Sequence, residues 1–339
     1  GVGPYHLTLG RNKKSLTLDL KSEPGKNIFY QLVKKADVVI DNFSSGVMKR
    51  LKIDHETLKS HNEKIISCSI SGFGMDAESN RPAYDNIIQG ISGLMSLTGS
   101  NHKEPIKSGV PISDLSTGMF AVIGILTALR NKEATGKGEK IDISMLDCQA
   151  SLLNYIATMH LISGKDPEPI GNEHPVHTPF NSYKTADGFI ILSVVHEDFW
   201  PNLVQALDLK DLDIEKYESA TGRSKDRAKI DSTLEEIFIT NTTEHWLKIL
   251  NEHRVPCGPV NKLSKVFNDP DLIKRDMIAQ VKQPSGAIVK MPGNPIKIGD
   301  AKTEYKNSPE LGEHSLEILN NWLGMTEEQI AELKEDNII

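Results

Sequence analysis

The sequence contains little cysteine and no paired cysteine motif. Its three cysteines, Cys68, Cys148 and Cys257, lie far apart in a chain of 339 residues. An odd number of distant cysteines argues against a disulfide framework or a zinc site, and favours buried thiols in a reducing compartment. The histidines between positions 174 and 196 also lack the spacing of metal ligands. We therefore expect no bound metal.

The sequence also has fewer basic than acidic residues. The 39 Lys and Arg residues are outnumbered by 46 Asp and Glu residues, for a formal net charge of −7. This balance disfavours nucleic acid and anionic membranes as main partners. No uncharged run reaches the ~20 residues that cross a membrane, and no signal-peptide pattern opens the chain. We expect a cytoplasmic protein, or a mitochondrial matrix protein in a eukaryote.

Several catalytic motifs are also missing. The chain has no G-x-S-x-G, no H-E-x-x-H and no Walker A pattern, which excludes the common hydrolases and nucleotide-triphosphate enzymes that carry them. No complete G-x-G-x-x-G follows a strand-like segment. A nicotinamide-dependent dehydrogenase is therefore disfavoured, although NAD titration would be needed to exclude it.

What is present begins with alternating strand and helix patterns. Apolar alternation and helical spacing predict, in order, a strand at 15–20, a helix at 25–36 and strands at 37–41 and 64–74. This order implies parallel pairing and a doubly wound α/β domain. Ligands bind such sheets beyond the carboxyl ends of the strands, where the loops 41–46 and 71–74 would lie.

The rest of the chain divides into further predicted elements. The patterns predict helices at 85–98, 115–130 and 148–163 and a strand within 135–147. They then predict a hairpin at 181–195, a helix from about 197, two amphipathic helices followed by a short apolar segment within 223–260, a hairpin-like piece at 285–299 and helices separated by Gly324 at 311–339. The hairpin turns at Asp187-Gly188. Residues 164–180, rich in Pro, Gly and His, have no period and are predicted as a linker.

Two basic or polar loops allow both a structural and a binding interpretation. Lysines and Arg11 around the segment 15–20 are favoured as a solvated strand edge over a phosphate site. Asn42 and Phe43 end a predicted strand and Arg50 follows. An exposed aromatic ring and a cation would suit adenine and phosphate, but an inward-packed Phe43 is equally consistent with the sequence.

Asp114, in "GVPISDLSTGMF", is the central ambiguity. A carboxylate just before an apolar helix is a normal cap, and local sequence favours that interpretation. Gly72 and Gly74 are likewise favoured as turn residues, although glycine turns also expose amides to an oxyanion.

The segments, taken together and in order, resemble the family III CoA-transferases, which include formyl-CoA transferase and carnitine CoA-transferase. The resemblance runs from about residue 4 to the C-terminus and is carried by "RNKKSLTLDLK", "ADVVIDNFSSGVMKRL", "IISCSISGFG", "RPAYDNIIQGISGLMSLTG", "SDLSTGMFAVIGILTAL", "TGKGEKIDISMLD", "VPCGPV" and "LGEHS". Each is weak alone, but the set in register is specific.

The resemblance assigns the nucleotide end of a CoA site. Leu18 and Lys21 of "LDLK" would lie along the CoA nucleotide. Asn42, Phe43 and Ser44 would line the adenine and ribose region.

It also assigns the reactive end. Asp114, in the D-x-x-T-G-M position, would be the nucleophile. Arg50 would meet a phosphate, and Ala83, Tyr84 and Asp85 would lie near the pantetheine and thioester. The reaction would pass through an aspartyl anhydride and an aspartyl-CoA thioester. We expect amides of the glycine turns and of the helix start at Asp114 to stabilise the oxyanions.

The implied fold is a doubly wound parallel sheet in a large domain, with a smaller α+β domain, in an interlocked homodimer. The expected boundaries are a large CoA-binding domain at 1–163, a linker at 164–180, a small domain at 181–265, and a linker and return to the large domain at 266–339. The family's first strand–loop–helix has no counterpart, so we expect several dozen residues to be missing before Gly1. No cofactor is expected to be permanently bound.

The expected substrates are an acyl-CoA, which carries coenzyme A, and a free carboxylate, including dicarboxylates, with succinyl-CoA a candidate donor. Two alternatives stay open. A related branch, the α-methylacyl-CoA racemases, carries His in "GHDINY" where this chain has Tyr84 in "AYDNII", and a tyrosine is a poor base near neutral pH. The other alternative is a non-catalytic CoA-binding protein.

Overall fold

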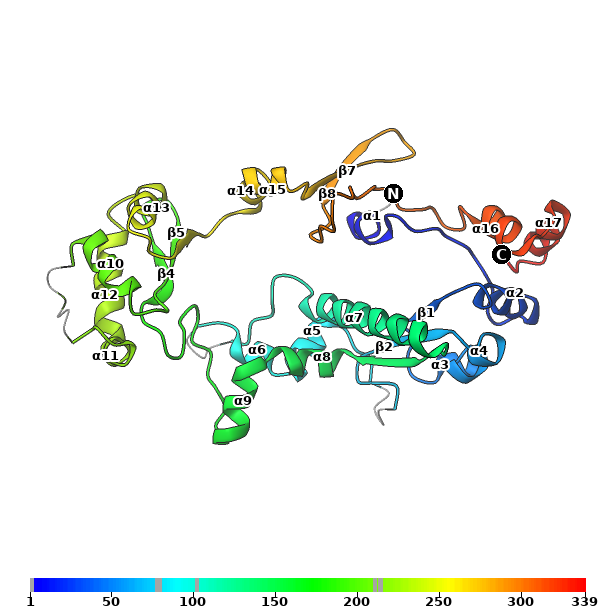
Figure 1. The fold of residues 1–339 in the computed structure, drawn as a ribbon, viewed down its shortest axis with the longest axis horizontal. Coiled ribbons are helices and arrows are strands. Elements are labelled where there is room, and N and C mark those ends of the chain that lie inside the picture. The colour runs from blue at the N-terminus through cyan, green and yellow to red at the C-terminus, as the bar shows by residue number, and fades with distance from the viewer. Residues whose placement is uncertain (1–2, 77–80, 101–103, 210–211, 213–215) are drawn as a thin grey trace. The chain divides into compact units, whose positions relative to one another are not determined.

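The computed structural model describes residues 3–76, 81–100, 104–209, 212 and 216–339. The chain forms two compact units, each assembled from separate stretches (Figure 1). The first comprises Gly1–Gly93, Gly109–Thr158 and Phe267–Ile339, and the second comprises Leu94–Ser108 and Met159–Val266. The second unit thus receives a short segment that interrupts the first in sequence.

A three-stranded parallel sheet organises the first unit. Its strands are β1 (Val38–Asp41), β2 (Ile66–Ser71) and β3 (Lys140–Ser144), in the order β1-β2-β3. Helix α2 (Glu23–Val33) precedes β1 and is capped by Ser22, whose hydroxyl accepts from the amide of Gly25 at 3.0 Å. The predicted strands at 37–41, 64–74 and within 135–147 are confirmed, as is the parallel pairing.

The predicted strand at 15–20 is wrong. The segment forms neither a strand nor a helix, and it pairs with no strand in the described part of the chain. Instead, the amide of Asp19 donates to the carbonyl of Ile338 at 2.8 Å, and Leu18 packs in the cluster around Ile28, Leu319 and Ile330. Apolar alternation describes one buried face, and here C-terminal helices rather than a sheet cover that face.

Helix α7 (Ile112–Thr135) is longer than the predicted helix at 115–130. It follows Pro111 and ends at Gly136, whose φ of +73° terminates the helix. It packs against β2, β3 and α8 (Met145–Leu152). Among the described residues, α7 is the one helix with the length and apolar composition to cross a membrane, a test that core helices also pass.

Two predicted helices are each divided in the structure. The segment 85–98 forms α5 (Asp85–Ile91) and α6 (Leu94–Leu97), separated at Gly93 with φ +86°. The segment 148–163 forms the end of α8 and α9 (Asn154–Ser163), separated at Asn154 with φ +49°. A left-handed residue interrupts the helical hydrogen-bond ladder, which apolar spacing does not reveal.

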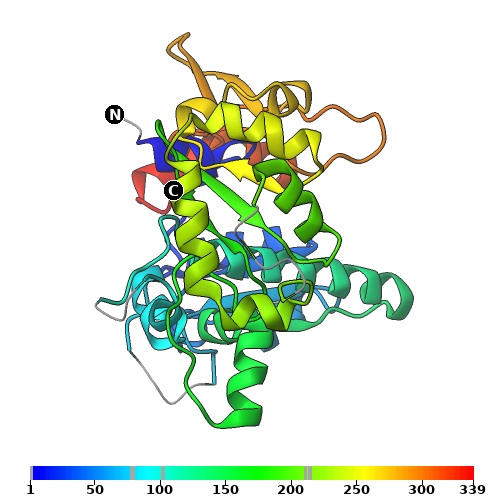
Figure 2. The ribbon, with the colours of Figure 1, turned by 90° about the vertical axis from the view of Figure 1, so that its left-hand side faces the viewer.

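The second unit combines an antiparallel sheet with helices. Strands β4 (Phe180–Lys184), β5 (Phe189–Ser193) and β6 (Cys257–Pro259) pair in that order. The predicted hairpin is confirmed, with residues 185–188 between its strands, but neither Asp187 nor Gly188 has the positive φ of a left-handed turn. The helices are α10 (Phe199–Leu207), α11 (Ala220–Lys225), α12 (Arg227–Phe238) and α13 (Thr243–Glu252). Figure 2 faces these green and yellow-green helices, which share one apolar core with the sheet.

The C-terminal stretch of the first unit contains a hairpin and two helices. Strands β7 (Ile278–Lys282) and β8 (Ile288–Pro292) form the hairpin, whose first strand lies before the predicted piece at 285–299. Helices α16 (Ser315–Leu323) and α17 (Glu327–Glu335) are separated at Gly324 as predicted. The remaining helices are α1 (Pro4–Gly10), α3 (Val47–Leu51), α4 (His55–His61), α14 (Leu263–Val266) and α15 (Pro270–Lys274).

Candidate active site

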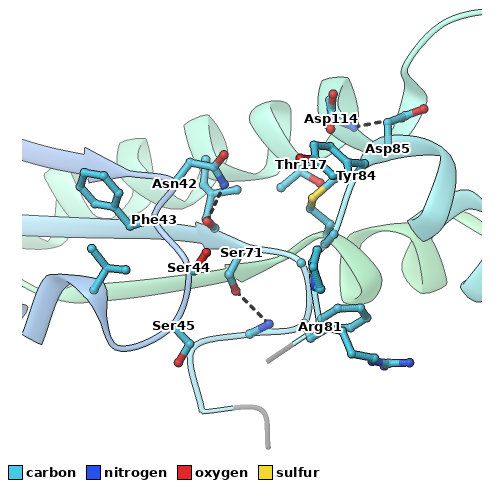
Figure 3. Close-up of a pocket in the computed structure, with 18 of the residues that line it drawn as sticks. Asn42, Phe43, Ser44, Ser45, Ser71, Arg81, Tyr84, Asp85, Asp114 and Thr117 are labelled. Carbon is cyan, nitrogen blue, oxygen red and sulfur yellow. Dashed lines mark hydrogen bonds between the residues drawn. The ribbon is translucent and has the colours of Figure 1, made fainter. Parts of the chain in front are cut away.

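A pocket of about 740 Å³ lies in the first unit, beyond the carboxyl ends of β1 and β2 (Figure 3). This is where ligands bind parallel α/β sheets, and the loops predicted to carry the site are there. The lining residues are Asn42, Phe43, Ser44, Ser45, Val47, Arg50, Ile70, Ser71, Gly72, Phe73, Gly74, Arg81, Pro82, Ala83, Tyr84, Asp85, Asp114, Thr117, Gly118 and Met145.

The loop after β1 is fixed to β2 by side-chain hydrogen bonds. The Asn42 amide donates to the carbonyl of Ile70 at 2.7 Å. The Asp41 carboxylate accepts from the amide of Phe43 at 3.1 Å and from the hydroxyl of Ser69 at 2.7 Å. With the backbone fixed in this way, the Phe43 ring remains 42% exposed at the pocket. The exposed ring agrees with the stacking interpretation rather than with an inward-packed side chain.

The glycine turn after β2 brings two stretches of backbone close together. A Cβ on Gly72 would lie 2.2 Å from the Cβ of Ala83, so only glycine lets the two segments pack this closely. Gly74 has φ +91°, and its amide donates to the Ser71 hydroxyl at 3.0 Å. The Gly74 amide is therefore already used within the turn.

Two arginines supply positive charge to the pocket. Arg50 lies near the end of α3, which starts after Gly46 with φ +79°. Arg81 places its guanidinium over the Phe73 ring, 4.4 Å from the centroid. Both arginines line the pocket. Cations and an exposed aromatic ring together suit an anionic nucleotide ligand.

Asp85 links α5 to the start of α7. Its Oδ1 accepts from the amide of Ser113 at 2.8 Å and from that of Asp114 at 3.4 Å. Its Oδ2 accepts from the Nε2 of Gln89 at 2.6 Å. The preceding residue, Tyr84, is 70% exposed.

Asp114 is the third residue of α7, and its side chain lines the pocket (Figure 3). Among the described residues its carboxylate has no hydrogen-bond donor. The helix is preceded by Pro111, which offers no side-chain cap, so the interpretation of Asp114 as an ordinary helix cap is wrong. Desolvation in the pocket, and secondarily the negative charge of Asp85, raise the pKa of the Asp114 carboxyl.

A buried polar layer lies beneath Asp114. The hydroxyls of Ser116 and Thr117 donate to the carbonyl of Ser113, at 3.3 Å and 2.6 Å. The Nε2 of Gln149 on α8 donates to the Ser116 hydroxyl at 2.8 Å. Ser116 and Gln149 are each about 1% exposed. These bonds hold the first turn of α7 against α8.

Most residues assigned from the sequence lie together. Those that line the pocket beyond β1 and β2 are Asn42, Phe43, Ser44, Arg50, Ala83, Tyr84, Asp85 and Asp114. Leu18 and Lys21 do not: Leu18 packs among C-terminal side chains, and Lys21 lies outside the pocket lining. Their contact with CoA stays a prediction.

Other lining residues were not singled out from the sequence. Arg81 lines the pocket but was not assigned, although it lies two residues before Ala83 in "RPAYD". That proximity was the available signal. Thr117 was not assigned although it belongs to the D-x-x-T-G-M motif. Met145 lies in the segment predicted to contain a strand, where an apolar residue carries no mark of a pocket. Among the described residues, no group of three potential metal ligands lies together.

Comparison with known proteins identifies the family. The model of CoA-transferase family III matches residues 1–315. The chain is 34% identical to succinyl-CoA:mesaconate CoA-transferase of Haloarcula marismortui, over 94% of this chain and 82% of that protein. It is 31% identical to human succinyl-CoA:glutarate CoA-transferase, over 99% of this chain and 77% of that protein.

Solved structures agree. A CaiB/BaiF family protein from Brucella suis superposes with a TM-score of 0.81 at 35% identity, over 94% of this chain and 84% of that one. The observed parallel sheet with packed helices is thus the family's mixed α/β fold. The chain belongs to CoA-transferase family III and is a CoA-transferase.

Proposed function

We propose that the protein transfers CoA from an acyl-CoA to a free carboxylate through covalent intermediates on Asp114. The observation that supports this most directly is that Asp114 lines the pocket as an exposed residue, and its carboxylate has no hydrogen-bond donor among the described residues. A carboxylate held by no amide keeps its lone pairs available for attack. The names of relatives, which pair succinyl-CoA with mesaconate or glutarate, support transfer between an acyl-CoA and a carboxylate.

In the first half of the proposed reaction, CoA passes from the donor acid to the Asp114 carboxylate. An Asp114 oxygen attacks the thioester carbonyl, the carbon–sulfur bond breaks, and CoA leaves as a thiolate. The product is a mixed anhydride between Asp114 and the acyl group. The thiolate then attacks the Asp114 carbonyl and expels the donor acid as a carboxylate, which leaves an aspartyl-CoA thioester.

The second half repeats these steps with the acceptor. The acceptor carboxylate attacks the aspartyl-CoA carbonyl and releases the thiolate, forming a second mixed anhydride. The thiolate attacks the acyl carbonyl of that anhydride, which releases the new acyl-CoA and restores Asp114. Electrons and charge balance without an added cofactor, because each step exchanges one carboxylate for one thiolate.

The expected source of oxyanion stabilisation needs correction. The amides of Ser113 and Asp114, at the start of α7, donate to Asp85. The amide of Gly74 donates to the hydroxyl of Ser71. In this conformation, these three amides are therefore occupied, and they do not stabilise a developing oxyanion unless the loops rearrange.

The pocket's cations support CoA as the ligand. Arg50 and Arg81 carry the positive charge, and Phe43 offers an exposed ring for the adenine. We propose acyl-CoA and carboxylates, including dicarboxylates, as substrates, with succinyl-CoA as a donor. We also carry forward the proposals that no cofactor is permanently bound and that the protein acts in the cytoplasm, or in the mitochondrial matrix of a eukaryote.

We further propose that the protein is a homodimer, interlocked as the family resemblance implies. One face of α7 supports association, because five large apolar side chains on it are 47–60% exposed: Leu115, Met119, Val122, Ile123 and Leu126. Exposed apolar patches of this kind mark interaction surfaces. Light scattering of the eluted protein would give the mass of the assembly, and a monomer at micromolar concentration would exclude the dimer.

A racemase is less well supported. It needs a base on each side of the substrate α-carbon. Among the described residues that line the pocket, the carboxylates are Asp85 and Asp114, which lie beside each other, and Tyr84 replaces the histidine. Deuterium incorporation at the α-carbon in heavy water would favour the racemase.

The decisive test of the transferase proposal is Asp114→Ala. With succinyl-CoA and a panel of carboxylates, we expect turnover to fall by at least about a thousandfold, since the covalent route is lost. Mass spectrometry of the quenched wild-type enzyme should find CoA attached to the peptide that contains Asp114. Full exchange by the Asp114→Ala variant would reject the proposed mechanism.

A further inference from the structure

The first turn of α7 is capped by a residue from outside the helix. Pro111 precedes the helix and has no side chain that could bond its first amides. Asp85, the first residue of α5, accepts from the amides of Ser113 and Asp114 with one oxygen, at 2.8 Å and 3.4 Å. Helix α5 therefore supplies a cap that α7 lacks.

Without that outside cap, Asp114 itself would be drawn to the helix start. It is the third residue of α7, and a side chain at this position usually reaches back to the amide of the N-cap residue, which Pro111 lacks. The amides that would attract the Asp114 carboxylate are therefore the ones that Asp85 occupies, those of Ser113 and of Asp114 itself. The positive end of the helix dipole attracts a carboxylate in the same direction. A carboxylate held there would point along its own helix rather than toward a substrate.

Asp85 is itself held in place. Its second oxygen accepts from the Nε2 of Gln89, one turn further along α5, at 2.6 Å. Gln89 and Ser113 are both completely buried. The cap is thus built from a restrained carboxylate and a buried amide, which gives the interaction a defined geometry.

We infer that Asp85 is a positioning residue for the nucleophile: it occupies the first amides of α7, so that the Asp114 carboxylate is not bonded to them and stays available at the pocket. The inference rests on the proposed role of Asp114. It extends that role by assigning Asp85 a function other than contact with the thioester. Asp85 acts through Asp114 and need not touch the substrate.

The surrounding charges allow a diagnostic pH readout. The charged and titratable groups that line the pocket with Asp114 are Arg50, Arg81, Tyr84 and Asp85, and Cys148 of α8 lies below, against Thr117. Of these, Asp85 raises the pKa of Asp114. If Asp85 is removed, Asp114 loses a repulsive charge and gains free amides, and both changes lower its pKa.

The test begins with Asp85→Ala, measured with succinyl-CoA and the best carboxylate acceptor from the panel. We expect kcat to fall about tenfold or more, with KM for succinyl-CoA changed less than about threefold, because the nucleophile is misdirected while the CoA-binding loops remain. The acid limb of the kcat profile should move to lower pH. Carbon-13 NMR of the aspartate carboxyls, with Asp114→Asn for assignment, should report the same shift without turnover.

A double variant separates the cap from a general loss of structure. In Asp85→Asn with Gln89→Glu, the oxygen of the introduced asparagine can still accept from the two amides, and its NH₂ group can donate to the new carboxylate. We expect this variant to regain at least about a third of the kcat lost in Asp85→Ala. Gln89→Glu alone places two carboxylates in contact, and it should be impaired.

Gln149→Met provides a matched control. Gln149, on α8, bonds Ser116 near the same helix start but makes no hydrogen bond to Asp85 or Asp114. Its loss should lower thermal stability without moving the acid limb.

Unchanged kcat and pH profile in Asp85→Ala, or no recovery in the double variant, would overturn the inference. Failure of the underlying function is distinguishable, because it would be detected as full turnover by Asp114→Ala.

Discussion

The starts of helices α4 and α7 both carry an aspartate, and the two aspartates are used differently. Asp54 precedes α4, and its carboxylate accepts from the amide and the hydroxyl of Thr57, at 3.4 Å and 2.9 Å. Asp114 lies within the first turn of α7, where Asp85 takes the amides and Asp114 lines the pocket. Asp54 caps its own helix, whereas Asp85 rather than Asp114 caps α7.

The comparison teaches how a catalytic carboxylate can lie at a helix start. The free amides and the dipole favour a negative charge there, and they would also capture the side chain. A second carboxylate from another helix satisfies the amides. It also leaves Asp114 in a less favourable environment, where its pKa is raised by desolvation and then by Asp85. The charged form of Asp114 is thus destabilised in the folded protein, and this local loss of stability occurs at the reactive residue.

The largest expected difference is in turnover. Asp114→Asn should reduce acyl exchange at least about a thousandfold, because an amide is a poor nucleophile. Asp54→Asn is the matched change at the other helix, where an asparagine still caps. We expect it to retain turnover within about twofold of wild type. Equal loss in both variants, measured by chromatography of the acyl-CoA products, would contradict the contrast.

Gly72→Ala should have the next largest effect. The new Cβ would overlap the Cβ of Ala83, at 2.2 Å, and displace the segment that leads into Tyr84 and Asp85. We expect the free energy of unfolding to fall by about 1–3 kcal/mol and turnover to fall with it.

Gly124→Ala is the control for that change. Gly124 lies within α7, where the nearest atom to a new Cβ is a methyl group of Ile141 at 3.4 Å. Alanine is the better helix former, so urea unfolding should show equal or greater stability. A Gly72→Ala protein as stable and active as Gly124→Ala would show that the close approach is unimportant.

A smaller effect on stability is expected at α4. Asp54→Ala removes a cap from an amide, which costs about 0.5–2 kcal/mol, and should lower the urea midpoint while leaving acyl exchange unchanged. Asp114→Ala should not lower stability at neutral pH, because no hydrogen bond to its carboxylate is lost among the described residues. If the urea midpoint fell for Asp114→Ala and not for Asp54→Ala, the aspartate that stabilises its helix would be the one in α7.

The smallest effects concern pH. Because the pKa of Asp114 is raised, activity should be lost on acidification at a higher pH than the ordinary aspartate value of about 3.9 implies. A raised pKa means that the folded state binds this proton more tightly than the unfolded state. Its contribution to stability is therefore present at low pH and is lost as pH rises through the folded pKa.

Asp114→Asn should accordingly gain stability relative to wild type as pH rises through that range. Urea unfolding of both proteins between about pH 4 and 8 would measure the difference. Asp54→Asn provides the comparison, and a wild-type protein that gains stability over Asp114→Asn with rising pH would contradict the sign.

Local signals in the sequence predicted most of the first unit's sheet and the hairpin of the second. The run of apolar and serine residues in β2, and the alternation of buried and exposed residues in β5, specify their structure through nearby residues. The segment 15–20 was mistaken for a strand, because its alternation is satisfied by C-terminal residues about 300 positions away. No local pattern identifies such a partner.

The pocket was predicted only in part, again because some of the residues are placed by distant parts of the chain. Residues in loops after predicted strands, such as Asn42 and Phe43, were assigned by their position and by the family resemblance, and they line the pocket. Leu18 and Lys21 were assigned by the same resemblance, and they do not line it. Their placement depends on how the N-terminal segment packs, which its own side chains do not determine.

The sequence by itself determined that an aspartate would stand at the start of a long apolar helix, since apolar spacing and backbone preferences act over a few residues. Only the tertiary structure decided what that aspartate does. Asp85 lies 28 residues before Ser113 and 29 before Asp114, and it reaches their amides because α5 packs against α7. A hydrogen bond between distant residues depends on the packing of the whole unit. Because Asp85 makes this bond, Asp114 does not cap its own helix and can act as the proposed nucleophile.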